Sequence, residues 1–257
     1  VRFGFKCSML RAWWVLLGMP LLAVVLLSIV FIGYGKMLGS PSSVSALLTR
    51  IVCELVIAII VFGAISGLVY RNWIMLLTNN LKFGIHSFDI NIKTSKCIII
   101  SLISMIIVVP FIIVIAKILI SVVDQYGLFG LLNGHMGAVT LSYILYIAAI
   151  LFSSAYAFSA LRNYTLNNLM LAKRIRFHSS LTFVGIALNL LLLIFVSSLT
   201  FGLAYPWLKI RFLRYQIENT TVFGNLDELE LTNDDSPLDT GILSLIHISE
   251  PTRHAQI

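Results

Sequence analysis

Long apolar segments separated by short polar stretches form the main pattern of this sequence. Five segments carry almost only hydrophobic side chains, and they cover residues 13–33, 51–70, 98–123, 138–161 and 181–206. A helix needs about 20 apolar residues to cross a hydrocarbon core of about 30 Å. The pattern therefore predicts an all-α fold, namely a polytopic membrane helix bundle with four spans and a fifth segment that either spans or re-enters. This transmembrane domain takes in residues 1–217.

The composition excludes an ordinary soluble domain. Hydrophobic residues make up 59% of the chain and charged residues 11%, whereas about a quarter of the residues are charged in soluble domains. Up to residue 217 the sequence has 17 basic and three acidic side chains. The basic ones gather before the first segment and after the second and fourth, so the positive-inside rule predicts that these loops are cytoplasmic. They stand singly beside apolar segments, which points to the lipid bilayer as partner and not to nucleic acid.

Both ends of the sequence differ from the apolar body. The chain starts at Val1 without methionine or signal peptide, inside a recurring motif, and we expect the native N-terminus to be longer. Residues 218–242 form an acidic polar tail with seven acidic side chains and no basic one. Residues 243–257 resemble the translation of a sequencing-library adapter. We interpret them as non-native and leave them out of the predicted fold.

The fifth apolar segment allows two arrangements. If residues 181–206 cross the membrane once, the basic side chains that follow lie outside, against the positive-inside rule. Gly202 and Pro206 can instead break the helix, so that the segment enters, turns and returns as a re-entrant hairpin. Residues 207–217 would then lie along the inner interface as an amphipathic helix. The charge pattern favours the hairpin, and the length of the apolar run favours the single span.

A short motif recurs along the chain. Residues 2–5, 82–85 and 176–178 each place a basic residue before phenylalanine, and residues 223–224 repeat it without the base. We interpret the unit as a helix end with a snorkelling arginine and an interfacial ring, then a turn at asparagine and a short amphipathic extended piece. The alternative is that arginine and an aromatic ring mark any cytoplasmic interface. The signature residues are Arg71, Trp73, Phe83, Arg162, Tyr164, Phe177, Arg214, Tyr215 and Phe223.

Several of these motifs together are similar to those of a known family. Residues 1–9, 83–86, 161–163, 174–177 and 202–210 resemble, in order, the YjgN family of bacterial inner-membrane proteins. The similarity runs from residue 1 to about residue 239. It implies residence in the bacterial inner membrane and a further N-terminal membrane part. It implies no activity, because the family is a domain of unknown function, and it transfers no catalytic residue.

Polar groups inside the apolar segments are the candidate functional residues. Glu54, Lys117 and Asn189 lie within the second, third and fifth segments, and intramembrane ionisable groups often mark ion or substrate paths. Glu54 and Lys117 are expected either to pair or to snorkel to headgroups, and Asn189 is expected to bond a neighbouring helix. Gly63 and Gly67 form a GxxxG face, which predicts close helix packing.

Two functional classes remain open at this point. The function we expect first is a solute or ion permease, which internal repeats, a proline within the third segment and Glu54 suit. The alternative is a non-transporting membrane scaffold, or an envelope-associated partner protein, which needs only helix-packing faces. We expect no enzyme, cofactor or metal site, because the sequence has no phosphate-binding loop, nucleophile motif or clustered His and Cys ligands.

Overall fold

The computed structural model describes residues 3–5, 7–37, 43–133 and 136–224. Residues 218–224 of the predicted acidic tail are described and are not a tail, since they complete the last helix and form the last strand; the rest of the tail and the adapter-like residues 243–257 lie outside this part. The helices are α1 (Met9–Trp13), η1 (Trp14–Gly18, one π-helical turn), α2 (Met19–Met37), α3 (Val44–Asn80), α4 (Thr94–Asn133), α5 (Met136–Asn167), α6 (Phe183–Leu199) and α7 (Tyr205–Glu218). The strands are β1 (Phe3–Phe5), β2 (Leu81–Phe83), β3 (His86–Ile90), β4 (Leu169–Leu171), β5 (Ile175–Ser179) and β6 (Thr220–Phe223).

Within the described part of the chain, four helical stretches are long and apolar enough to cross a membrane, which confirms the prediction of a polytopic helical membrane protein. They contain 28 to 35 residues, so at 1.5 Å per residue they are roughly 42–52 Å long. This exceeds a hydrocarbon core of about 30 Å, and the ends of these helices therefore project beyond it. The stretches are Met9–Lys36, Ala46–Asn80, Thr94–Gly127 and Met136–Asn167.

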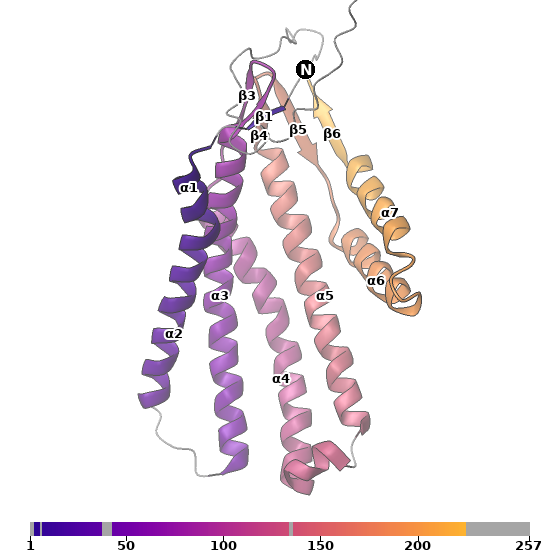
Figure 1. Cartoon of the computed structure of the whole chain (residues 1–257). Coiled ribbons are helices and arrows are strands. Elements are labelled where there is room, and N and C mark those ends of the chain that lie inside the picture. Colours follow the sequence, from indigo (N-terminus) through magenta and orange to yellow (C-terminus); the bar gives the residue numbers. More distant parts are fainter. Residues whose placement is uncertain (1–2, 6, 38–42, 134–135, 225–257) are drawn as a thin grey trace, which may run out of the picture.

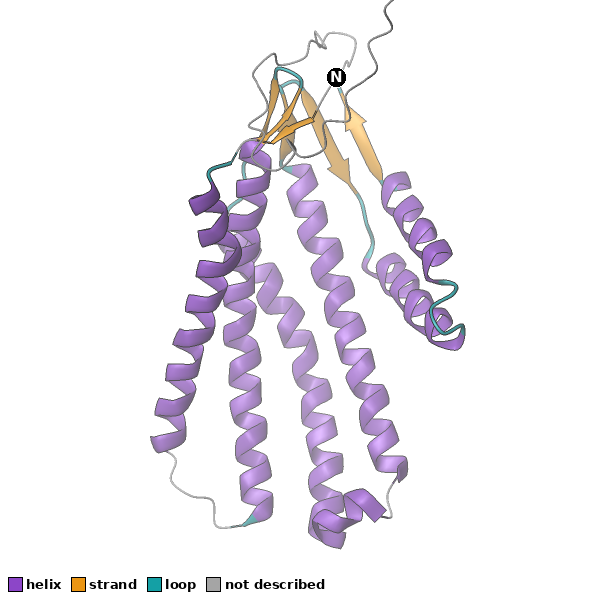
Figure 2. Ribbon diagram, viewed as in Figure 1, coloured by secondary structure: helices purple, strands orange, loops and turns teal. Residues whose placement is uncertain are grey.

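A six-stranded antiparallel sheet lies at one end of the bundle (Figure 2). Its strands are paired in sequence order, from β1 to β6. The predicted extended piece after each asparagine corresponds to β2, β4 and β6. Joining these pieces into one sheet was not predicted, because strands of three to five residues are too short to show a clear alternating pattern.

The chain consists of three modules that meet in the sheet (Figure 1). Each module has the same order of elements: a strand, two helical segments and a second strand. The first module has β1 and β2 around α1–α3, the second β3 and β4 around α4 and α5, and the third β5 and β6 around α6 and α7. Tight turns join the modules. Gly84 has a positive φ of 58° in the first turn, where Phe83 pairs with His86, and Ala172 and Lys173 have φ values of 53° and 58° in the second.

The fifth apolar segment forms the helical hairpin of the third module. α6 has 17 residues, about 26 Å, and the chain turns at Phe201 and Gly202, which have φ values of 49° and 86°. Pro206 lies in the first turn of α7, where proline is tolerated. Ser179 of β5 pairs with Thr220 of β6, so the chain returns to the end from which it left. Figure 1 shows the tip ending short of the far ends of α4 and α5. Of the two arrangements considered, this is the returning hairpin, but residues 207–217 belong to its return arm α7 and do not form the separate interfacial helix that was predicted (Figure 1).

The third module packs against the second through a small apolar core. Phe212 of α7 and Ile186 of α6 are buried there, and both lie on faces turned toward α5. The contact fixes the hairpin beside the bundle. The buried members are Leu151, Ala155, Leu181, Ile186, Ala187 and Phe212.

Candidate functional site

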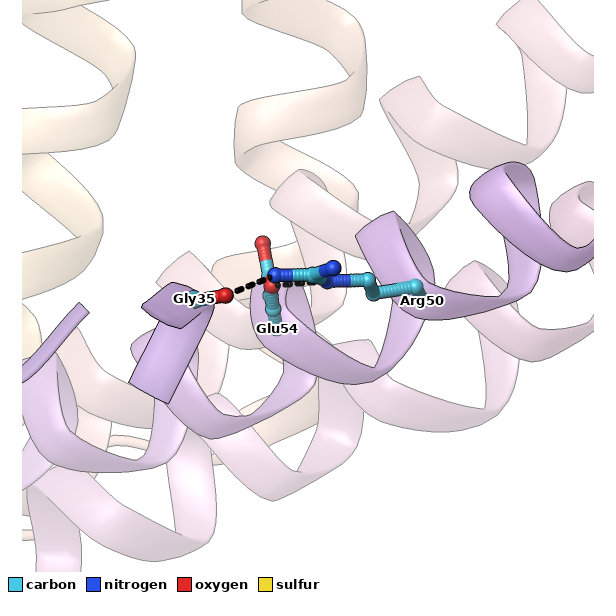
Figure 3. Close-up of polar contacts among 3 residues, drawn as sticks. All are labelled: Gly35, Arg50 and Glu54. Carbon is cyan, nitrogen blue, oxygen red and sulfur yellow. Dashed lines mark hydrogen bonds and ion pairs between the residues drawn. The ribbon is translucent and has the colours of Figure 1, made fainter. Parts of the chain in front are cut away.

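The glutamate within the second apolar segment takes part in a clamp at the end of α3 farthest from the sheet (Figure 3). Glu54 Oε1 accepts a bond of 2.9 Å from Arg50 Nε, one helical turn earlier. Arg50 Nη2 also donates to the carbonyl oxygen of Gly35 in α2, at 2.6 Å. The arginine thus connects the loop-side ends of α2 and α3. The two charged side chains remain 20% and 26% exposed.

The pair of Glu54 and Lys117, one of the two arrangements considered for these residues, is not formed. Lys117 is exposed on α4, and it has no hydrogen bond or ion pair with any other residue that the structure describes. The reason is local geometry, because Arg50 lies four residues before Glu54 on the same helix face and needs no tertiary movement to reach it.

Asn189 bonds its own helix instead of a neighbour. Its Nδ2 donates to the carbonyl oxygen of Gly185 at 2.8 Å. Its side chain also lines a cavity of about 450 Å³ between α6 and α7. Of the three intramembrane polar candidates, Asn189 is therefore the one that lines a described cavity.

The two glycines of the GxxxG face lie against α4. A Cβ atom on Gly67 would come within 2.6 Å of Ile98 Cα and 2.7 Å of the Cys97 carbonyl oxygen. At Gly63 it would come within 2.9 Å of Met105 Cγ. The backbones of α3 and α4 thus approach closely at Gly67, and only glycine leaves room for this contact.

The α4–α5 contact is closed in a similar way by small residues. Ser153 Oγ of α5 donates to the carbonyl oxygen of Ser104 in α4 at 2.8 Å, and both serines are buried. Ala149, 1% exposed, lies one turn before Ser153 on the same face of α5. The small-residue face thus brings α5 against α4 without leaving a polar group unbonded.

The three asparagines of the repeat make the same bond. Asn80, Asn168 and Asn219 each donate from Nδ2 to the carbonyl oxygen four residues earlier, at 2.6, 2.7 and 2.8 Å. Each stands at or just after the end of the second helix in its module. The side chain thus folds back onto the last turn of its helix, and at Tyr215 the same carbonyl also accepts from the backbone N–H of Asn219. This shared geometry explains the recurrence of asparagine in the sequence.

The two signature tyrosines close their modules. Tyr164 Oη accepts from the backbone N–H of Lys93, the residue before α4, at 2.8 Å. Tyr215 Oη lies 3.1 Å from Thr182 Oγ1, and Thr182 is the N-cap of α6. Each tyrosine therefore ties the end of one helix to the start of its partner. Trp73, at the corresponding end of α3, has no hydroxyl group and is 40% exposed.

The signature arginines take three different roles. Arg162 bonds the side chain of Gln216 in α7 and thereby links the second and third modules. Arg71 donates from Nη1 to Asn72 Oδ1 at 3.0 Å, and its buried Nε has no hydrogen-bond partner in the described part of the chain. Arg214 lines the cavity between α6 and α7.

The signature phenylalanines lie in the sheet. The rings of Phe3 and Phe83 are 4.9 Å apart, and those of Phe88 and Phe177 are 6.4 Å apart. Phe223, on the edge strand β6, contacts the ring of His178 at 6.3 Å. The Phe3–Phe83 and His178–Phe223 contacts each join the two strands of one module, whereas Phe88 and Phe177 link β3 of the second module to β5 of the third.

One polar contact centre was missed from the sequence. Asn163 Oδ1 accepts from Ser179 Oγ and from the Leu181 N–H, at 2.7 and 3.0 Å, and its Nδ2 donates to the Leu181 carbonyl at 2.8 Å. It clamps the link between β5 and α6 onto the end of α5. Asn163 stands between two signature residues in the sequence, which was the available signal. Among the described residues no cluster of three His, Cys, Asp or Glu side chains suits a metal ion.

Long apolar helices that carry a small sheet at one end define the chain as a multi-pass membrane protein. The family model for a bacterial protein of unknown function (DUF898) matches residues 1–238, and the chain belongs to this family. The chain is 39% identical over 257 residues to the inner membrane protein YjgN of Salmonella typhimurium (strain LT2). The aligned region covers 96% of this chain and 64% of that protein.

Two further relatives are the inner membrane proteins YjgN of Escherichia coli O157:H7 and of Escherichia coli strain K12. Each is 32% identical over 258 residues, which cover 96% of this chain and 65% of the relative. The chain thus spans a little less than two thirds of these relatives. No solved structure matches it. These relatives place the protein in the bacterial inner membrane.

Proposed function

We propose that this protein is a non-transporting, non-enzymatic scaffold of the inner membrane. In this proposal the membrane modules hold the six-stranded sheet at one membrane surface, where an envelope-associated partner can meet it. The observation that carries the proposal is the closed contact of α3, α4 and α5. Small residues bring the three helices together, and the buried serines bond backbone carbonyls.

The main alternative is a solute or ion permease. The modular repeat favours it, as does Pro110 within α4. A permease needs polar groups that face a water-filled path. Glu54, the strongest candidate for such a group, is bound to Arg50 in the clamp between α2 and α3. The cavities described here lie between α2 and α3, between α6 and α7, and beside β3, not within the α3–α4–α5 contact.

Cysteine accessibility in native membranes tests the proposal. Ser153→Cys places a thiol of similar size in the α4–α5 contact, in a background with Cys7→Ser and Cys53→Ser. The native Cys97, which is 0% exposed at the α3–α4 contact, serves as a second internal reporter. Thr221→Cys on the exposed edge strand β6 is the matched accessible control.

A membrane-impermeant maleimide is applied to spheroplasts and to inverted vesicles. For a scaffold we expect Thr221→Cys to react in one of the two preparations, whereas Ser153→Cys and Cys97 react only after unfolding in SDS. Reaction of Ser153→Cys in intact membranes would reveal a water path through the bundle. That result would reject the scaffold and favour the permease.

A further inference from the structure

The return helix of the third module presents two distinct faces. Leu208 and Phe212 are buried, and Phe212 belongs to the core shared with α5. Trp207, Arg211 and Arg214 follow at intervals of four and three residues, so they share another face of α7. This second face lines the cavity of about 450 Å³ between α6 and α7, together with Asn189, Ile210, Tyr215 and Glu218.

The two guanidinium groups in this cavity have no protein counterpart. Within the part of the chain that the structure describes, neither Arg211 nor Arg214 forms a hydrogen bond or ion pair. Glu218 is the acidic side chain in the lining, and it stands at the sheet-side end of α7. The lining therefore carries one net positive charge. A ligand with a single negative charge would neutralise it.

The surroundings of the cavity select an amphiphile over a dissolved ion. Trp207 and Ile210 are 63% and 60% exposed, and Phe201 and Leu203 at the hairpin tip are 98% and 86% exposed. Within a bilayer, lipid chains cover such an apolar surface. A phospholipid is the molecule that offers a phosphate beside its own acyl chains, so it satisfies the guanidinium groups and the apolar side chains together.

We infer that this cavity binds the headgroup of an anionic phospholipid with a phosphodiester group, such as phosphatidylglycerol. Arg211 and Arg214 donate to the phosphate oxygens, as the forked guanidinium group favours. Asn189 uses one N–H for Gly185 and keeps its second N–H and its Oδ1 for a headgroup hydroxyl. Trp207 and Ile210 contact the start of the acyl chains. The site stands independently of the proposed scaffold function.

The chain offers a matched control on the same helix. Lys209 does not line the cavity, and its Nζ lies 5.9 Å from the ring centre of Phe212. It follows Trp207 by two positions and therefore lies on the opposite side of α7. Lys209→Gln removes the same charge as Arg211→Gln. Any difference between the two variants reports the site and not the general attraction of a basic helix for an anionic membrane.

The binding experiment uses the full chain reconstituted in mixed vesicles. Trp13, Trp14 and Trp73 are replaced by Phe, so that Trp207 reports lipid contact when brominated phosphatidylglycerol or brominated phosphatidylcholine quenches its fluorescence. We expect a preference for phosphatidylglycerol that falls roughly fivefold in Arg211→Gln and roughly 30-fold in the double variant with Arg214→Gln. Lys209→Gln should stay within roughly twofold of the parent.

Native mass spectrometry of the chain with all its tryptophans gives a second measurement of the same lipid preference. It also guards against misfolding of the tryptophan variants. Arg211→Lys with Arg214→Lys keeps the charge but loses the forked donors, and we expect it to lose several-fold of the preference. Equal effects of Lys209→Gln and Arg211→Gln would overturn the site in favour of diffuse attraction. Displacement of the lipid by inorganic phosphate or glycerol 1-phosphate would overturn the lipid assignment in favour of a soluble phosphate compound.

Discussion

The contact between α3 and α4 at Gly67 leads to a quantitative prediction. In Gly67→Ala the new Cβ would lie 2.6 Å from Ile98 Cα and 2.7 Å from the Cys97 carbonyl oxygen. Both are backbone atoms, so no side-chain rotation relieves the overlap. Non-bonded carbon atoms pack best at about 3.5–4.0 Å, and the two helices therefore have to separate by about 1 Å.

The expected cost follows from two opposing terms. Overpacking of a well-packed contact destabilises by about 1–3 kcal/mol, and alanine has a helix propensity about 1 kcal/mol better than glycine. The net loss of unfolding free energy is therefore about 0–2 kcal/mol. For a domain of this size 1 kcal/mol corresponds to roughly 2–4 °C. We expect the Tm of Gly67→Ala to fall by up to roughly 8 °C.

Two other glycines provide the controls for this measurement. Gly63→Ala meets Met105 Cγ at 2.9 Å, and a methionine side chain can move aside, so the Tm should fall less. Gly33→Ala on α2 meets nothing within 4 Å and should leave the Tm unchanged or slightly higher. Thermal unfolding of the purified protein in detergent, followed by tryptophan fluorescence, measures all three. A Gly67→Ala variant at least as stable as Gly33→Ala would refute the close approach of α3 and α4.

Three further predictions concern the clamps and turns. Ala172→Gly should raise the Tm by roughly 2–4 °C, because a non-glycine residue with positive φ costs about 1 kcal/mol; an unchanged or lower Tm would contradict the turn geometry. Asn163→Leu should lower the free energy of unfolding by about 2–3 kcal/mol, since the Leu181 N–H and carbonyl lose their side-chain partner. Hydrogen exchange at the Leu181 amide should then be faster, whereas wild-type exchange there would argue against the clamp. Glu54→Gln should change the free energy of unfolding by less than about 1 kcal/mol, because the ion pair is partly exposed. A larger loss of stability, or a loss of ion flux in proteoliposomes, would point to a role beyond the clamp with Arg50.

Several candidate residues could be recognised from the sequence, but their partners could not. Glu54 stands out as an acid within an apolar segment, yet its partner is Arg50 and not Lys117. The recurring asparagines and tyrosines indicated a repeat, and the structure gives the reason, a capped helix end and a bond to the start of the partner helix. Local patterns reveal which side chains are unusual, whereas their contacts depend on how distant segments pack.

The sequence by itself determined the membrane class, the four long helices and the family. Each follows from local properties, because an apolar run of about 20 residues has to be helical in lipid wherever it occurs. Only the tertiary structure decided that six short strands join in one sheet and that the fifth apolar segment returns as a hairpin. Strands of three to five residues are not stable alone. Their pairing joins residues far apart in the chain, such as Phe3 with Phe83, so no local pattern encodes it.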